Sequence, residues 1–349
     1  MQTKIQPVIT TIIPTYRRPF RLERAIRSVL SQSFDQFQVC IYDNASGDET
    51  ADVVAKLREQ DDRIKYFRHD QNIGGSRNFL FGMNRVDTPY FSFLSDDDVL
   101  LPWCYETALS GFDKYPDAIF SAGSYINVDE RGKVLLTGIP EWTREGYFAP
   151  PEGFYEMLTI GLHWTSVLFR KDVIEEVGLV DPEVGAPIDV DLHLRIAARF
   201  PFVISGKPCS LFVRHSSSTS VAPNLDLYWP GLEKIILNLK NDQRIPPELR
   251  DHAENFLSHK NKMTIFHLGV NYIKQKSLED ALMTAAILSD HFNDRQKSGM
   301  IKAAVKMRKY LPPLYDLLFY LNLWRRLTFW RRERKLQNKY GSYARFLKP

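Results

Sequence analysis

The chain has 349 residues, of which 44% are hydrophobic and 25% charged, and its formal net charge is +4. This is the composition of a globular protein with one large domain or two of ordinary size. The three cysteines lie far apart without a CxxC pair, which argues against a disulfide framework or a zinc site and favours reduced thiols in the cytoplasm.

Two kinds of membrane segment are not expected. The N-terminus has too short an apolar core for a signal peptide, and no apolar run approaches the length of a transmembrane helix.

The charge is unevenly distributed along the chain. Residues 301–349 contain 13 Lys and Arg against 2 Asp and Glu, which leaves a formal charge of −7 for the first 300 residues. A basic tail on an acidic body calls for an explanation.

Strand and helix patterns alternate along the first half of the chain. Short β-branched or apolar runs predict strands at 8–13, 38–42, 64–67 and 90–94. The spacing of apolar residues predicts helices at 20–32, 49–58 and 75–83. Strands separated by such helices form βαβ units, so we expect an α/β fold with a mainly parallel, Rossmann-like sheet. Such sheets bind ligands beyond the carboxyl ends of their strands.

The middle of the chain mixes both patterns, and the C-terminal third is helical. The expected strands are 119–126, 165–169 and 210–214, and the expected helix is 189–199. Helical periodicity then covers residues 227–239, 247–272, 278–292 and 299–310. We therefore expect an α/β domain over residues 1–222 and a helical region over residues 223–349.

Three consecutive aspartates, Asp96, Asp97 and Asp98, follow the fourth expected strand. Two unit charges about 4 Å apart repel by roughly 1 kcal/mol in water and by more near a protein surface. Three carboxylates at this position are therefore favoured if a cation lies among them. Oxygen ligands of this kind suit Mg²⁺ or Mn²⁺, with phosphate oxygens completing the shell. The alternative is a solvated acidic turn, because aspartate is common after strands.

Two other segments are expected at the same edge of the sheet. Asp43 ends the second strand, where its carboxylate could accept hydrogen bonds from a ligand or simply begin an Asx turn. A glycine turn at Asn72–Asn78 leads into a helix. Its backbone N–H groups could meet a phosphate, and Arg77 could neutralise one. An ordinary turn would carry the same glycines.

Five motifs occur in order, and together they resemble one enzyme family. They are Ile12–Tyr16, Ala25–Gln32, Tyr42–Asp48, Asn72–Asn78 and Phe93–Leu100. In this order and spacing the chain is similar to the family 2 glycosyltransferases, which have a GT-A fold, and the similarity covers about residues 6–220. It implies a nucleotide-diphosphate sugar donor, most often a UDP-sugar, a divalent metal and inversion at the anomeric carbon.

The resemblance assigns roles around the nucleotide. Pro14, Thr15 and Tyr16 match the first loop, which holds the nucleotide base. Asp43 matches the acid that hydrogen-bonds the base, and Arg77 matches a basic residue near the nucleotide.

The same resemblance divides the aspartate triplet. Asp96 and Asp98 match the DxD acids, Asp96 nearer the ribose and Asp98 as the metal ligand, while Asp97 is a candidate to contact the sugar. Ser95 stands where many members of the family have another acid. His215 matches a late histidine that approaches the metal or the diphosphate in relatives; a surface histidine is the alternative.

An acceptor hydroxyl also needs a base, and a carboxylate is the usual one. The stretch Pro187–Arg195 resembles the family's acidic pair at the start of a helix, although Ile188 replaces the usual glutamate. Asp189 matches the catalytic aspartate, and Asp191 is the second choice. Asp189 would also suit a helix N-terminus on electrostatic grounds alone.

The basic tail combines aromatic residues with arginines over residues 311–335. This pattern suits a helix on an anionic membrane surface, which would agree with a lipid-linked or other glycan acceptor in envelope polysaccharide synthesis and with a location at the inner face of the membrane. A helix packed on the protein is the alternative. Nucleic acid is not an expected partner, because no recognised module is present.

Two other functions compete with glycosyl transfer. A nucleotidyltransferase on a similar fold would need glycines in the loop after the first strand, and Pro14–Arg18 has none. A catalytically silent glycan- or membrane-binding scaffold would not need to keep both the metal acids and a base candidate.

Overall fold

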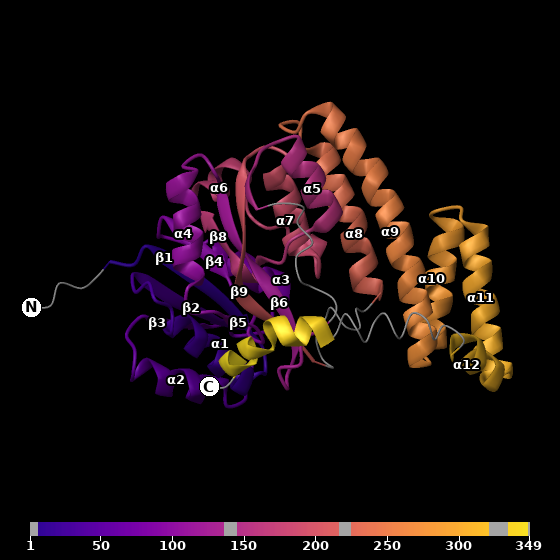
Figure 1. The fold of residues 1–349 in the computed structure, drawn as a ribbon, viewed down its shortest axis with the longest axis horizontal. Helices are drawn as coiled ribbons and strands as arrows, with labels where there is room; N and C mark the ends of the chain where they lie inside the picture. Colours follow the sequence, from indigo (N-terminus) through magenta and orange to yellow (C-terminus); the bar gives the residue numbers. More distant parts are fainter. Residues whose placement is uncertain (1–5, 136–144, 216–224, 321–333, 348–349) are drawn as a thin grey trace, which may run out of the picture. The chain divides into compact units, whose positions relative to one another are not determined.

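Figure 1 shows the computed structural model, which describes residues 6–135, 145–215, 225–320 and 334–347. The chain forms two compact units, one of residues 1–245 with 333–349 and one of residues 246–332. The boundary that we predicted at residue 222 lies outside the described residues, and the helix that follows it, α8 (Leu225–Asn241), belongs to the first unit.

The first unit contains a mixed nine-stranded sheet within its described residues. The strand order is β3 (Ile64–Arg68), β2 (Phe37–Asp43), β1 (Ile9–Thr15), β4 (Tyr90–Phe93), β8 (Val167–Arg170), β6 (Phe120–Asp129), β9 (Phe202–Arg214) and β5 (Val99–Leu100), while β7 (Gly146–Phe148) also pairs with β9. The strands from β3 to β4 are parallel, as expected, whereas β8, β5 and β7 run antiparallel to their neighbours.

Helices cover both faces of this sheet (Figure 1). One face packs in a single core against α1 (Pro19–Leu30), α2 (Thr50–Arg58) and α4 (Cys104–Lys114). The other face meets α3 (Gly75–Met83) and α7 (Ile188–Ala197). On that face a Cβ at Gly82 would lie 2.6 Å from Ile12 Cγ2, so only glycine lets α3 approach β1 this closely. Because β1 is covered on both sides, all seven of its residues are buried.

Shorter elements complete the first unit. They are α5 (Glu152–Ile160), α6 (Asp172–Glu176) and three 3₁₀ turns, η1 (Trp164–Ser166), η2 (Pro182–Val184) and η3 (Gly341–Leu347).

The register of β1 brings three strand ends together. Thr15 pairs with Asp43 at the end of β2, and Ile12 pairs with Phe93 at the end of β4. Since the three strands are parallel, their carboxyl ends and the loops that follow them lie at one edge of the sheet. The acidic triplet, Asp43 and the loop after β1 therefore reach the same edge, as the sequence predicts.

The second part of the basic tail returns to the first unit. Leu336, Tyr340, Tyr343, Phe346 and Leu347 pack with a core cluster of strands β5, β6 and β9. This packing concerns residues that follow the aromatic and basic stretch 311–335, so it does not decide between the membrane surface and the packed helix that we gave for that stretch.

The second unit is helical, as expected for this part of the chain. Its described residues form α9 (Pro247–Gln275), α10 (Leu278–Asp290), α11 (Arg295–Tyr310) and α12 (Pro312–Tyr320). The tail residues 321–333 lie outside the described residues. None of the helices in the described ranges combines the length and the apolar character that a membrane crossing requires.

Candidate active site

The loop after β1 is held against the acidic triplet. The Thr15 hydroxyl donates a hydrogen bond of 2.8 Å to Asp96 Oδ2. Pro14 and Thr15 are buried, whereas Tyr16 is 38% exposed. Of these three predicted nucleotide contacts, Tyr16 therefore has the most surface available to a ligand.

Asp43 is buried at the end of β2 and belongs to a local hydrogen-bond network. Its Oδ1 accepts bonds from the Ser46 N–H (2.9 Å) and hydroxyl (2.6 Å), and its Oδ2 accepts a bond from the Tyr66 hydroxyl (2.6 Å). A carboxylate has about four acceptor positions, and three are taken here. The carboxylate thus holds the local turn through the N–H three residues on, rather than through the Asx turn that we gave as the alternative, and one acceptor position is left for a ligand.

The glycine turn is anchored to the neighbouring strand end. Asn44 Oδ1 accepts a bond from the Ile73 N–H (2.8 Å), and Gly74 has a φ of +87°, which is costly for other residues. Arg77 is exposed in the first turn of α3 and makes no hydrogen bond or ion pair with any described residue. Its side chain is therefore accessible to solvent.

Asp98 is engaged within the protein. Its side chain is 1% exposed, its Oδ2 accepts a bond of 2.8 Å from the Thr165 hydroxyl, and its Oδ1 accepts a bond of 2.9 Å from the Val213 N–H. Burial, followed by the charge of Asp97, raises the pKa of Asp98 well above its usual value. This geometry does not favour the metal role that the sequence predicts for Asp98, because Asp98 ties the triplet to η1 and β9.

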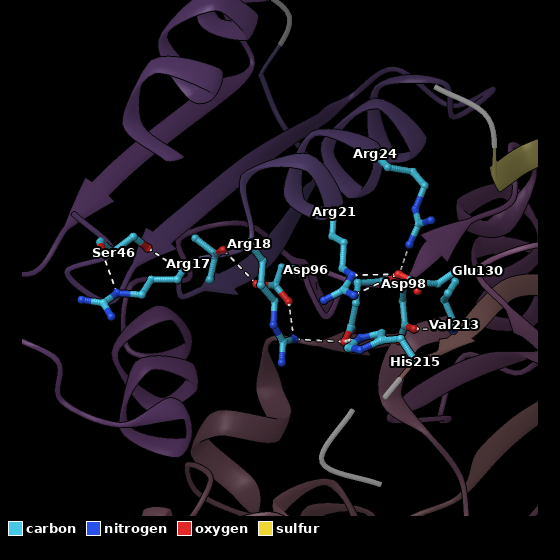
Figure 2. Close-up of polar contacts among 12 residues, drawn as sticks. Arg17, Arg18, Arg21, Arg24, Ser46, Asp96, Asp98, Glu130, Val213 and His215 are labelled. Carbon is cyan, nitrogen blue, oxygen red and sulfur yellow. Dashed lines mark hydrogen bonds and ion pairs between the residues drawn. The ribbon is translucent and has the colours of Figure 1, made fainter. Parts of the chain in front are cut away.

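Asp96 and Asp97 share a cation from the protein itself. Arg18 Nη1 lies 3.0 Å from Asp96 Oδ1 and 3.0 Å from Asp97 Oδ2 (Figure 2). Burial and the charge of Asp97 raise the pKa of Asp96 to about 6, and Arg18 offsets only part of that shift. Burial also acts to lower the pKa of Arg18, but the two carboxylates outweigh it and the pKa is raised.

The oxygen of Asp97 that pairs with Arg18 also contacts the predicted histidine. His215 follows β9, and its Nε2 lies 2.8 Å from Asp97 Oδ2. The side chain of Asp97 is 13% exposed, which is more than that of Asp96. Asp97 and His215 thus form a carboxylate–imidazole pair at the edge of the sheet.

The arginines of α1 were missed at the sequence level. Arg24 Nη2 donates a bond of 2.7 Å to the backbone oxygen of Asp97, and Arg21 pairs with Glu130 at 2.9 Å (Figure 2). Their spacing with Arg18 places them along one side of a helix. That spacing, in a helix directly after the nucleotide loop, was the signal available in the sequence.

The resemblance implies a divalent metal, and only some of the ligands for such a metal are present among the described side chains. Within the described residues, no group of three or more His, Cys, Asp and Glu side chains is arranged to hold a metal ion. Asp97 and His215 supply one oxygen and one imidazole nitrogen, both suitable for Mn²⁺. They fit a metal that takes its other ligands from a bound diphosphate or from water, as Mg²⁺ commonly does.

The two base candidates on α7 differ sharply in accessibility. Asp189 is the second residue of the helix, its side chain is 17% exposed, and its Oδ2 lies 3.7 Å from Nδ1 of His163. Asp191 is 0% exposed, and its carboxylate accepts bonds from Arg195 (2.8 Å) and Asn238 (2.9 Å). Burial raises the pKa of Asp191. Of the two, only Asp189 is accessible to an acceptor.

Comparison with known sequences identifies glycosyltransferases among the relatives of this chain. A family model described as "Glycosyl transferase family 2" matches residues 10–178. The GalNAc(5)-diNAcBac-PP-undecaprenol beta-1,3-glucosyltransferase of Campylobacter jejuni is 36% identical over 106 residues, which are 30% of this chain and 34% of that protein. The chondroitin synthase of Pasteurella multocida is 25% identical over 319 residues, 87% of this chain and 31% of that protein. The chain spans about a third of the length of these relatives.

Solved structures share the fold at low sequence identity. The Staphylococcus aureus protein TarS (residues 1–349) in complex with UDP-GlcNAc has a TM-score of 0.61 at 14% identity, covering 96% of this chain and 91% of that one. The mannosyltransferase PcManGT of Pyrobaculum calidifontis, in complex with GDP-Man and Mn²⁺, has a TM-score of 0.52 at 15% identity, covering 96% and 88%. These similarities confirm the expected GT-A fold with a helical C-terminal region.

The bridge formed by Arg18 yields a first prediction. In Arg18→Ala, Asp96 and Asp97 lose the cation between them, so we expect a free energy of unfolding lower by about 2 kcal/mol without metal. In this variant Mn²⁺ would no longer compete with a guanidinium for the two carboxylates. Adding Mn²⁺ should therefore raise the melting temperature of the variant more than that of the parent chain. The measurement is thermal unfolding with and without MnCl₂.

Arg21→Ala is the matched control, since its ion pair with Glu130 is at the surface and such pairs contribute little. If Arg18→Ala unfolds at the parent's temperature and responds to Mn²⁺ no more than the parent does, the proposed competition is refuted.

Proposed function

The chain belongs to the glycosyl transferase family 2, and on this premise we propose that it transfers a sugar from a nucleotide-diphosphate donor to an acceptor hydroxyl with inversion at the anomeric carbon. The observation that carries the proposal is the convergence of the three parallel strand ends with β9. It puts the Thr15 loop, Asp43, Asp97 and His215 at one edge of the sheet.

We infer that the donor is a UDP-sugar. The TarS structures contain UDP or UDP-GlcNAc, whereas PcManGT contains GDP-Man, so the inference rests on TarS. Tyr16 and the remaining acceptor position of Asp43 would contact the nucleoside, together with Pro14 and Thr15. Arg77 would meet a phosphate from the first turn of α3, where N–H groups and the helix dipole also favour an anion.

We assign the metal to Asp97 and His215 rather than to Asp98. Asp98 is buried and each of its oxygens already accepts a hydrogen bond within the protein, whereas Asp97 is partly exposed and beside an imidazole. A bound Mg²⁺ or Mn²⁺ supplies charge stabilisation to the departing diphosphate. Asp96 keeps its role at the nucleoside side, where Thr15 and Arg18 hold its carboxylate.

Asp189 is the proposed general base. Its carboxylate takes the proton from an acceptor hydroxyl as the hydroxyl oxygen bonds to the anomeric carbon. The bond between that carbon and the diphosphate breaks, and its electron pair leaves with the diphosphate. Asp189 lies in the first turn of α7, where the helix dipole favours a negative charge.

We also propose a class of acceptor and a cellular location. The Campylobacter jejuni relative is a glucosyltransferase whose name specifies an undecaprenol-linked glycan, so we propose a lipid-linked or other envelope glycan as acceptor. An acceptor of that kind would agree with an anionic membrane surface as a partner of the basic tail and with a peripheral location at the cytoplasmic face.

The two acids Asp97 and Asp98 give opposite predictions. Asp97→Asn should lower metal-dependent turnover of the donor by about 10²–10³-fold, because a charged ligand is lost where negative charge develops. Asp98→Asn keeps the shape of the side chain, so it should lower the melting temperature and leave turnover within about tenfold of the parent. Release of UDP from UDP-sugars at varied MnCl₂ measures both. Loss of turnover in Asp98→Asn with normal turnover in Asp97→Asn would return the metal to Asp98.

The two acids of α7, Asp189 and Asp191, also give different predictions. Asp189→Asn should bind UDP-sugar like the parent and lose about 10²–10⁴-fold in transfer, because only proton abstraction is removed. Asp191→Asn should mainly destabilise the chain, because Arg195 loses a buried partner. Calorimetric titration of UDP and a transfer assay test both variants. Unimpaired transfer by Asp189→Asn would exclude it as the base.

The tail gives a prediction about membranes. In Arg325→Glu/Arg326→Glu, binding to vesicles that contain phosphatidylglycerol should weaken by about tenfold or more, since each basic residue near such a surface contributes about 1 kcal/mol. Lys302→Glu/Lys306→Glu changes the net charge by the same amount on α11, where both lysines are exposed, and should bind like the parent. Vesicle co-sedimentation measures this. Equal binding by all three chains would rule out the tail as the membrane contact.

A further inference from the structure

Three aromatic rings gather beside the base candidate. His163 and Phe212 stack with ring centroids 4.6 Å apart, and Tyr125 meets His163 edge-on at 4.9 Å. Tyr125 also meets the edge of Phe212 at 6.4 Å. The rings come from β6, from the residue before η1 and from β9, so the sheet and a tight turn fix them together. We call Tyr125, His163 and Phe212 the aromatic cluster.

The aromatic cluster lies on the less buried of the two faces of its strands. Side chains alternate along a strand, and the neighbours on the other face, Ile126 and Leu211, are 1% and 0% exposed. The rings of the cluster are only partly buried, and the side chain of His163 is 37% exposed. Partly exposed aromatic side chains that lie together, rather than singly, often mark a binding site.

The position of the cluster relates it to the reaction. His163 Nδ1 lies 3.7 Å from Asp189 Oδ2, so the stacked rings continue directly from the proposed base. On β9, Phe212 precedes Val213, which holds Asp98, and His215, which contacts Asp97. The cluster therefore adjoins the base through His163 and is linked to the acidic edge through β9.

We propose that the aromatic cluster is the acceptor subsite and that it binds a pyranose ring, an inference that rests on the proposed glycosyl transfer. A pyranose has an apolar face of C–H groups that packs on aromatic rings, while its hydroxyls stay at the rim. A ring stacked on Phe212 or Tyr125 presents a hydroxyl towards Asp189. An acyclic polyol has no flat face, so the cluster selects against an alditol acceptor.

The test compares variants of the cluster in the full-length chain. A UDP-sugar that the parent hydrolyses serves as donor, and methyl pyranosides of glucose, galactose and their N-acetylamino derivatives serve as acceptors, with ribitol as the acyclic control. Tyr125→Leu and Phe212→Leu remove a ring and keep an apolar side chain. Tyr125→Phe and Phe212→Tyr keep the ring. Melting temperatures of all four variants report folding.

We expect at least one methyl pyranoside to raise UDP release above hydrolysis, and ribitol to have no effect. The leucine variants should lose about tenfold in kcat/KM for that pyranoside and keep donor hydrolysis within about twofold, whereas the variants that keep a ring should resemble the parent. The proposal is overturned if the leucine variants use the pyranoside like the parent, or if ribitol alone is an acceptor. It is also overturned if donor hydrolysis occurs and no pyranoside accelerates it. Failure to hydrolyse any donor would instead contradict the proposed function itself.

Discussion

Electrostatic repulsion within the triplet Asp96–Asp98 is the constraint around which the proposed site is organised. Two features offset this repulsion. Arg18 lies between Asp96 and Asp97, and neutral hydrogen-bond donors surround Asp98. Only Asp97 keeps both partial exposure and a second partner of metal-binding type, His215. The three acids are of one residue type, so their different proposed roles follow from the different groups that they contact.

The same reasoning explains how acids of one helix acquire different roles. Asp191 lies in the interior, where a paired carboxylate ties α7 to α8 through Asn238. Asp189, two residues earlier, lies where the helix begins and faces His163. In the proposed reaction, structural acids are thus buried and paired, whereas reactive acids are partly exposed and placed beside imidazoles.

Much of this arrangement could be predicted from sequence. The βαβ alternation gives the parallel strands, and their carboxyl ends bring Asp43 and the triplet to one edge. Sequence could not separate Asp97 from Asp98, because the partners of Asp98 come from η1 and β9, far along the chain. Nor could it find the aromatic cluster, because its three rings come from separate elements that meet only in the fold. Sequence also contained no sign that residues 336–347 pack on a core cluster of the first unit, because their partners lie on β5, β6 and β9.

The central claim is that this edge of the sheet binds a nucleotide sugar and transfers the sugar with inversion. The most direct measurement is proton NMR of the first-formed product when the full-length chain turns over α-linked UDP-sugars with Mn²⁺. The account predicts that the β-anomer appears first, and that it mutarotates only later. First appearance of the α-anomer, or the absence of turnover with every donor tested, would contradict it.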